Sequence, residues 1–407
     1  MGIALAFDAP PPSPAVAPVE VAGYFIDTTS GSPLHRLTRY QAGETFALVR
    51  AYFFVVAVTY VPLVIAAALG PAPIGAPSGA VRLPFLYDWN ITFAFLVSLP
   101  AVIVFTMSDH AALATALSRI QQDGILVIPE PEAQKLSRVW GPRFTKINHL
   151  SLVAGTIVGI VLVVGNVNAY SQPGVGFWVD FSDPRPGALL VGCVFLYCIV
   201  ALYFSMIVYV IRSIAIAFFL NDVVDDAQLR MLPFHPDRCG GLRPVGSFGL
   251  RNQYVLSILG LNVVLLAGVT FSYLTIPSSL FALVTGAALA YTLLGPLVFM
   301  GPLLSFRTGM VRTKAELLGE VAQRLRRELQ RLRKELVDGE LRQEDEELID
   351  RLRKVGGVID ELPVWPFDAH TLRRFLAAYV TPLLGAAAVA LLDRAWDVVM
   401  SLIKITS

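Results

Sequence analysis

Residues 310–362 read MVRTKAELLGEVAQRLRRELQRLRKELVDGELRQEDEELIDRLRKVGGVIDEL, a charged segment between two apolar parts of the chain. In its first half, apolar residues alternate steps of four and three, as in the seam of a coiled coil, at Leu318, Ala322, Leu325, Leu329, Leu332 and Leu336. After a predicted turn at Asp338 and Gly339, the spacing returns at Leu348, Leu352, Val355, Ile359 and Leu362. The pattern predicts an antiparallel helical hairpin, with an assembly seam between copies of the chain at Leu325, Leu329, Leu332 and Leu336.

The composition of the whole chain is that of an integral membrane protein. Its 407 residues are 55% hydrophobic and 15% charged, whereas soluble domains carry about 25% charged residues. The mean hydropathy is +0.63. Apolar segments long enough to cross a hydrocarbon core of about 30 Å are residues 51–69, 89–107, 149–169, 189–211, 254–274, 280–301 and 375–392. We therefore expect an all-α integral membrane protein with about seven transmembrane helices.

Basic residues are distributed unevenly among the segments that connect these spans. Of the 32 Lys and Arg residues, 15 lie between Arg307 and Arg374. Because short basic loops stay in the cytoplasm, the hairpin, loop 108–148 and loop 212–253 are predicted to form a cytoplasmic helical layer. The same rule places the N-terminus inside and the C-terminus outside. High Ala, Gly, Pro and Arg content suggests a bacterial source, so the expected location is the bacterial inner membrane, with the chain crossing several times.

The predicted organisation has four parts. Residues 1–50 form a flexible N-terminus and an interfacial helix, and residues 51–301 form six transmembrane helices with the two cytoplasmic loops. Residues 302–368 form the charged hairpin, and residues 369–407 form the last transmembrane helix with a C-terminal amphipathic extension. Within this last helix, small and hydroxyl-bearing residues predict a pore-lining face at Thr381, Pro382 and Gly385.

The most distinctive loop is LPFHPDRCGGL, residues 232–242. One interpretation is a ligand or regulatory site formed by His235, Asp237, Arg238, Gly240 and Gly241. A second is a metal site, because His235, Asp237 and Cys239 are two residues apart and would point the same way in an extended chain. A third is a tight structural turn, in which Asp237 binds its own backbone and the two glycines supply positive φ. The HPDxxGGL pattern resembles a cytoplasmic loop of uncharacterised bacterial multi-pass membrane proteins, a resemblance that implies membrane location and no particular activity.

The absence of several known sequence motifs argues against some classes of function. No Ser-His-Asp or Cys-His arrangement, phosphate-binding glycine loop, CxxC or HExxH motif is present, so we expect neither an enzyme nor a bound cofactor or metal. Coupled pumps use ionisable residues within their spans, and these are nearly absent here. The remaining prediction is an oligomeric channel for ions or small solutes. Its predicted layout is similar to that of insect odorant-receptor channels, a likeness of architecture without a shared motif.

The alternative is a non-conducting membrane sensor or scaffold that recruits a cytoplasmic protein partner through the hairpin. Either function involves the lipid bilayer, and the hairpin favours a homo-oligomer. Nucleic acid is not an expected partner, because glutamates at helical spacing offset the arginines of the hairpin, among them Glu316, Glu320 and Glu328.

Overall fold

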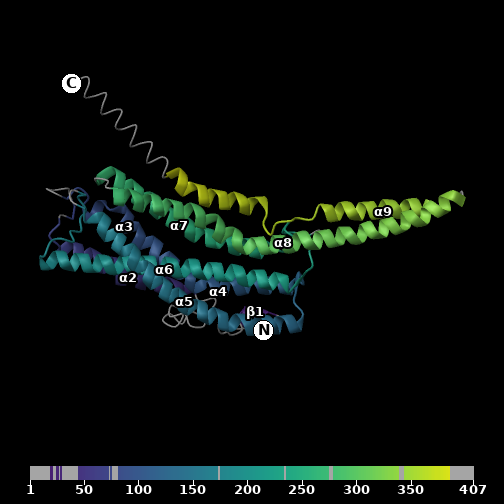
Figure 1. The fold of residues 1–407 in the computed structure, drawn as a ribbon, viewed down its shortest axis with the longest axis horizontal. Helices are drawn as coiled ribbons and strands as arrows, with labels where there is room; N and C mark the ends of the chain where they lie inside the picture. Colours follow the sequence, from purple (N-terminus) through teal and green to yellow (C-terminus); the bar gives the residue numbers. More distant parts are fainter. Residues whose placement is uncertain are drawn as a thin grey trace, which may run out of the picture.

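The structure, a computed structural model, describes residues 19–21, 24–26, 28–29, 45–72, 74–75, 81–172, 175–232, 235–274, 278–338 and 343–385. It is a bundle of long helices that run side by side (Figure 1). Its long helices are α2 (Thr45–Leu69), α4 (Leu99–Gln122), α5 (Glu130–Tyr170), α6 (Pro186–Asp225), α7 (Arg243–Tyr273) and α8 (Ser278–Asp338). The short helices η1 (Phe85–Tyr87), α3 (Trp89–Phe93) and η2 (Ala94–Ser98) lead into α4.

Six helices in the described part of the chain are long and apolar enough to cross a membrane: Phe46–Leu69, Trp89–Gln122, Glu130–Tyr170, Pro186–Asp225, Arg243–Tyr273 and Ser278–Arg333. The protein is therefore a multi-pass helical membrane protein. The predicted seventh span, residues 375–392, begins in a helix of residues 369–385 and continues outside the described residues, as does the predicted C-terminal extension.

Large apolar side chains cover the outward faces of the bundle. On α2 and α5 the exposed residues include Phe53, Phe54, Ile65, Leu150, Val153, Ile157, Val161 and Val164. Such a surface is unfavourable in water and is matched by hydrocarbon, so these faces contact the bilayer. On α5 the exposed large apolar residues begin at Leu150, and this position marks one edge of the apolar belt.

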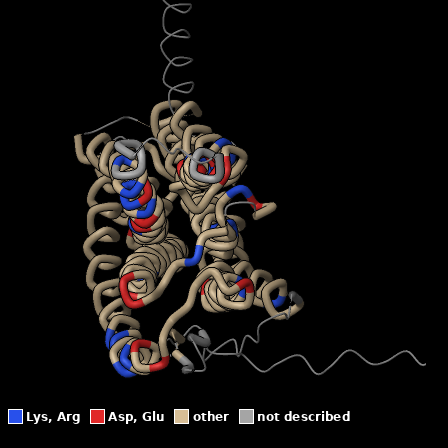
Figure 2. Tube along the Cα trace, turned by 90° about the vertical axis from the view of Figure 1, so that its right-hand side faces the viewer, with Lys and Arg blue, Asp and Glu red and all other residues tan. Residues whose placement is uncertain are grey.

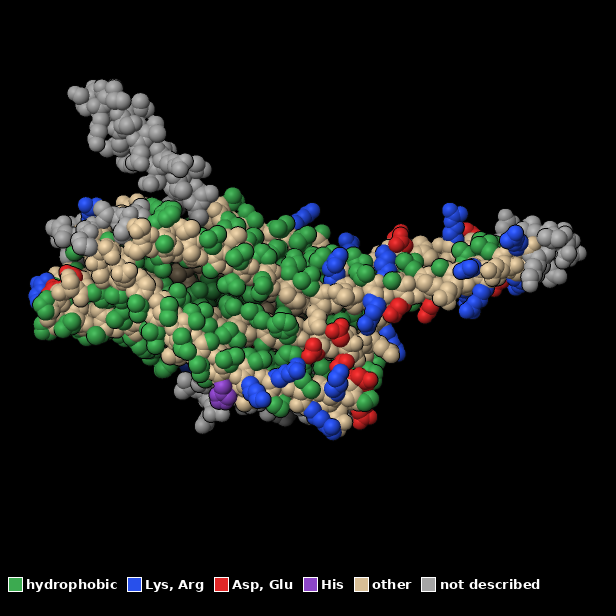
Figure 3. Space-filling model, viewed as in Figure 1, with side chains coloured by type: hydrophobic (Ala, Val, Ile, Leu, Met, Phe, Trp, Pro, Cys, Tyr) green, Lys and Arg blue, Asp and Glu red, His purple; other side chains and the backbone are tan. Residues whose placement is uncertain are grey.

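Beyond that edge lies the charged end of the bundle, which we define as the described residues of the ranges 108–148, 212–252 and 307–374. Figure 2 faces this end, and Figure 3 shows acidic and basic side chains gathered over it. Its interior is nevertheless apolar: the rings of Trp140, Phe144 and Phe219 lie 5.3–5.6 Å apart. The strands β3 (Leu126–Val127) and β4 (Gln228–Leu229) pair antiparallel across it. Loop 108–148 is thus largely a continuation of α4 and α5, without a break between the apolar spans and their polar extensions.

The N-terminal segment differs from the expected flexible N-terminus. Strands β1 (Val19–Val21) and β2 (Tyr24–Ile26) pair antiparallel, and they contact α4 and α5 respectively. Ile26 and Thr28 are buried at 0% and 1% exposure. The predicted interfacial helix lies outside the described residues.

Helix α8 continues from the membrane span into the charged segment for 61 residues, about 90 Å at 1.5 Å per residue. Helix α9 (Gln343–Asp360) packs along it (Figure 1). Lys314 Nζ lies 3.3 Å from an Asp360 carboxylate oxygen. The residues that join the two helices, 339–342, lie outside the described part of the chain, so the turn and the assembly role stay predictions.

Candidate functional site

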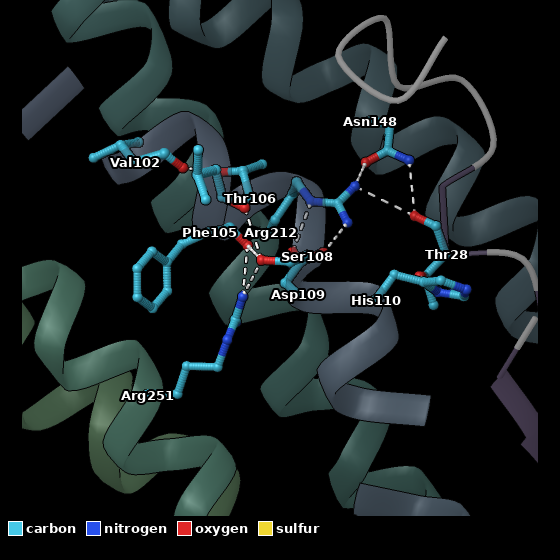
Figure 4. A network of polar contacts seen from close by, with 11 residues as sticks. Thr28, Val102, Phe105, Thr106, Ser108, Asp109, His110, Asn148, Arg212 and Arg251 are labelled. Atoms are coloured by element: carbon cyan, nitrogen blue, oxygen red, sulfur yellow. Dashed lines mark hydrogen bonds and ion pairs between the residues drawn. The ribbon is translucent and has the colours of Figure 1, made fainter. Parts of the chain in front are cut away.

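The candidate site lies where α4, α5, α6 and α7 leave the apolar belt. At its centre the Arg212 guanidinium of α6 binds the Asp109 carboxylate of α4 through two hydrogen bonds, Nε–Oδ2 at 3.1 Å and Nη2–Oδ1 at 3.0 Å (Figure 4). Both side chains are almost fully buried, at 4% and 5% exposure. Paired, planar geometry of this kind is the arrangement that offsets the desolvation cost of a buried ion pair.

The remaining donors and acceptors of this pair are supplied by α5 and by the N-terminal segment. Arg212 Nη1 donates to Asn148 Oδ1 at 2.8 Å and to the Thr28 carbonyl at 3.3 Å. Asn148 Nδ2 donates to the same carbonyl at 3.2 Å. Thr28 Oγ1 lies 2.6 Å from His110 Nδ1. This buried network therefore joins three helices and fixes residue 28 against them.

Next to the network, a second arginine bridges α7 and α4. Arg251 Nη2 donates to the Phe105 carbonyl at 3.1 Å and to Ser108 Oγ at 2.6 Å (Figure 4). Its guanidinium also lies over the Phe105 ring, 4.7 Å from the centroid. A cation on a ring face, combined with a charge-assisted hydrogen bond, holds the guanidinium in one position.

Arg251 and Ser108 line a cavity of about 880 Å³ between α4, α7 and the loop that precedes α7. The charged and titratable residues of its lining are Arg119, Asp123, His235, Asp237, Arg243 and Arg251. The predicted loop thus contributes three lining residues, His235, Asp237 and Gly241. Arg238 is exposed, and Gly240 lies against Met231.

The loop itself is a tight turn organised by one carboxylate. Asp237 Oδ1 accepts hydrogen bonds from the backbone of Cys239 at 2.9 Å and of Gly241 at 3.0 Å, while Oδ2 accepts one from Arg243 at 3.1 Å. His235 Nδ1 lies 2.7 Å from Oδ1. Burial opposes ionisation of Asp237, but these hydrogen bonds prevail and hold its pKa below the ordinary range.

Backbone geometry explains the glycines of this turn. Arg238, Gly240 and Gly241 have φ values of 58°, 65° and 92°, a region that side chains with a Cβ adopt poorly. The chain is therefore not extended here, and Cys239 is fully buried, with its pKa raised to about 12 by burial. Among the described residues, no group of three or more His, Cys, Asp or Glu side chains could hold a metal ion.

The candidate pore residues do not share one environment. A Cβ on Gly260 of α7 would lie 3.0 Å from Pro382 Cβ, and one on Gly385 would lie 3.3 Å from Val264, so Pro382 and Gly385 pack against α7. Thr381 is exposed, and its hydroxyl donates to the Ala377 carbonyl of its own helix at 2.6 Å. Thr381 and Pro382 both line a cavity of about 450 Å³ between α7 and the last helix, whereas Gly385 does not.

The residues of the predicted assembly seam also differ from one another in how far they are exposed in a single chain. Leu332 is buried and Leu325 is half-buried, whereas Leu329 is 49% exposed. The side chain of Leu336 lies outside the described part of the structure. On α9, Leu352 is buried and Val355 is 48% exposed. The exposed seam positions are therefore available to a second chain.

At the opposite end of the bundle, Asp88 lies just before the first residue of the second span. Its Oδ2 accepts a hydrogen bond from the Trp178 indole at 3.0 Å, and its Oδ1 accepts one from the Ile91 backbone at 3.1 Å. Burial raises the pKa of this carboxyl to about 6, even though the hydrogen bonds favour the ionised form.

We expect the contribution of Asp88 to the stability of the folded protein to fall as the pH rises from about 4 to about 6. The folded-state pKa of Asp88 exceeds its ordinary value of 3.8, so the folded state binds the proton more tightly than the unfolded state in this window. The total change in the free energy of unfolding that Asp88 contributes across this window is on the order of 3 kcal/mol. Thermal unfolding midpoints of wild type and Asp88→Asn in detergent, compared between pH 4 and 7, test this. Parallel curves for the two proteins would contradict it.

Comparisons of the chain with known protein families, characterised proteins and solved structures find no match.

Proposed function

We propose that the chain assembles into an oligomeric channel for ions or small solutes, with the last helix bordering the conduction path. One observation carries the proposal: residues 369–385 pack against α7 and α8 on one face. Arg374, Ala377 and Thr381 follow one another along an exposed stripe, which the exposed apolar residues Leu376 and Leu384 adjoin. A helix beside an aqueous path carries small and polar side chains. A lipid-facing helix carries large apolar ones, as α5 does.

The packed face of this helix is well fixed, as a pore-bordering helix requires. The rings of Phe299 and Phe375 stack with centroids 4.0 Å apart. Tyr291 donates to the Tyr379 carbonyl, and Tyr379 donates to the Thr292 carbonyl, both at 2.9 Å. Because the Thr381 hydroxyl donates within its own helix, its oxygen lone pairs remain able to accept a hydrogen bond from water or to bind a cation.

The distribution of charge supports passive conduction over coupled pumping. The buried pair of Asp109 and Arg212 has no net charge at one edge of the apolar belt, and the buried Asp88 carboxyl lies just before the second span at the opposite end of the bundle. In the proposed orientation, the charged end faces the cytoplasm of a bacterial cell and the bundle crosses the inner membrane, because basic residues concentrate there. No catalytic activity is part of the proposal.

A second candidate is a non-conducting scaffold, favoured by the arm that α8 and α9 form beyond the bundle (Figures 1 and 3). Arginine and glutamate pairs run along this arm, including Arg312–Glu316 at 3.8 Å and Arg331–Glu328 at 3.3 Å. Such a mixed-charge surface suits a protein partner or another copy of the chain more than nucleic acid. The scaffold would conduct no ions in purified bilayers.

The channel proposal is tested by thiol accessibility at Thr381. In a background with Cys193, Cys198 and Cys239 replaced, we expect Thr381→Cys to react with a charged, water-soluble thiol reagent and the modification to reduce single-channel current severalfold. The matched control is Thr156→Cys on the lipid-facing surface of α5, because Thr156 is also exposed and also donates within its own helix, to Leu152 at 2.8 Å. We expect this control thiol to stay unmodified.

Equal modification of both thiols would remove the support for an aqueous path at Thr381. Purified protein that reconstitutes well and passes no current would favour the scaffold instead. Gly385 is unsuitable for this test, because a larger side chain there meets Val264 of α7 and would disturb packing before it altered a pore.

A further inference from the structure

The lining of the cavity between α4 and α7 carries more basic than acidic side chains. It contains the three arginines Arg119, Arg243 and Arg251 and the two carboxylates Asp123 and Asp237. Asp237 already accepts three backbone hydrogen bonds and contacts His235. Asp123 is exposed at the end of α4. With three arginines against two carboxylates, the lining has a formal net charge of +1 when His235 is neutral.

Hydroxyl groups and an apolar wall complete the lining. Ser108, Thr115 and Ser247 can donate or accept hydrogen bonds beside the arginines. Ala111, Ala112, Ala116, Phe248 and Leu48 provide the apolar surface. A volume of about 880 Å³ falls within the range of small-molecule sites, roughly 300–1,000 Å³. The cavity thus suits a ligand with a compact anionic group and an apolar part.

The position of the cavity relative to the apolar belt further restricts the class of ligand that it could bind. Ser108 follows the apolar part of the second span, and Leu48 belongs to α2, whose neighbouring Phe46 and Val49 are exposed apolar residues. The cavity therefore lies at the edge of the apolar belt, where lipid phosphates lie in a bilayer. Guanidinium groups bind phosphate oxygens through paired hydrogen bonds, and Arg251 is already held in place by Phe105 and Ser108.

We infer that this cavity binds a phosphate group through Arg119, Arg243 and Arg251. The phosphate can belong to an anionic lipid headgroup or to a small soluble molecule, because both present the same oxygens to the arginines. The site is independent of whether the protein conducts.

The test measures thermal stabilisation of the full-length protein in mild detergent during titration with a short-chain anionic lipid, dioctanoyl phosphatidylglycerol. Separate titrations use inorganic phosphate and the zwitterionic dioctanoyl phosphatidylcholine. We expect saturable stabilisation of the wild type by the anionic lipid or by phosphate. The double variant Arg119→Gln/Arg243→Gln should raise the apparent dissociation constant at least about tenfold. Both side chains are exposed at the cavity mouth, so the unliganded midpoint should stay near wild type.

The matched control is Arg138→Gln/Arg324→Gln, which removes the same charge from exposed positions outside the cavity lining; we expect a change of less than about twofold. Saturation by phosphatidylglycerol alone assigns the phosphate to a lipid, and saturation by inorganic phosphate assigns it to a soluble ligand. Equal loss of binding in the two double variants, equal stabilisation by phosphatidylcholine, or no saturable response of the wild type would overturn the proposal.

Discussion

The variant Gly241→Ala should lose roughly 3–5 kcal/mol of stability, from positive-φ strain together with overpacking. Gly241 has a φ of 92°, and a Cβ there would lie 1.7 Å from Ile125 Cδ1 and 2.9 Å from Cγ1. A χ1 rotation of Ile125 would move both carbons, but Ile125 is fully buried among packed apolar side chains, so relief of the overlap must displace its neighbours or the turn. The thermal unfolding midpoint in detergent measures the loss.

The matched control for this prediction is Gly124→Ala. Gly124 has a φ of 67° and precedes Ile125, but a Cβ there would meet nothing within 4 Å. This variant should show only the cost of positive φ, about 1–2 kcal/mol. Similar midpoints for the two variants would mean that the turn absorbs the overlap without cost, and the packing argument would then be wrong.

Replacing Arg212 with Met should destabilise the protein by about 3–5 kcal/mol, because it leaves the Asp109 carboxylate buried without its partner. Asn148 and the Thr28 carbonyl also lose a donor. The double variant Arg212→Met/Asp109→Leu should recover part of the loss, since no unpaired charge then remains in the interior. Chemical or thermal unfolding in detergent gives all three values.

An exposed ion pair serves as the control for this comparison. Lys135 Nζ lies 3.0 Å from Asp226 Oδ1, but the Lys135 side chain is 63% exposed. Lys135→Met should therefore change stability by less than about 1 kcal/mol. If the double variant at Arg212 and Asp109 were less stable than Arg212→Met alone, the buried pair would not be the source of the loss.

The apolar spans were predictable from the sequence, whereas the ends of their helices were not. Hydropathy marks only the part of a helix that faces hydrocarbon, so it found residues 149–169 inside a helix that begins at Glu130. The polar extension has its own buried face, with Trp140 and Phe144 directed into the charged end. Loop 108–148 was predicted to be helical, but hydropathy alone could not show that its helix from Glu130 is continuous with the span.

The candidate site was only partly predictable, for a different reason. The loop around His235 was visible because its Pro, Asp and Gly residues favour a turn locally. The pairing of Asp109 with Arg212 joins residues 103 positions apart, and sequence spacing contains no information about such a contact. The only signal was that each residue follows the end of a predicted span on the same side of the membrane, which places both at one depth.

The anchoring of Thr28 by Arg212 also sets an order of events during synthesis. The two residues are 184 positions apart, so at 5–20 residues per second the arginine emerges from the ribosome roughly 10–40 s after the threonine. Throughout that interval the N-terminal strands lack a complete surface to pack against, because α4, α5 and α6 must all be inserted and aligned first. Thr28 is thus translated before α4, α5 and α6 but reaches its native position only after all three, so its binding to Arg212 requires that these three neighbouring spans have assembled.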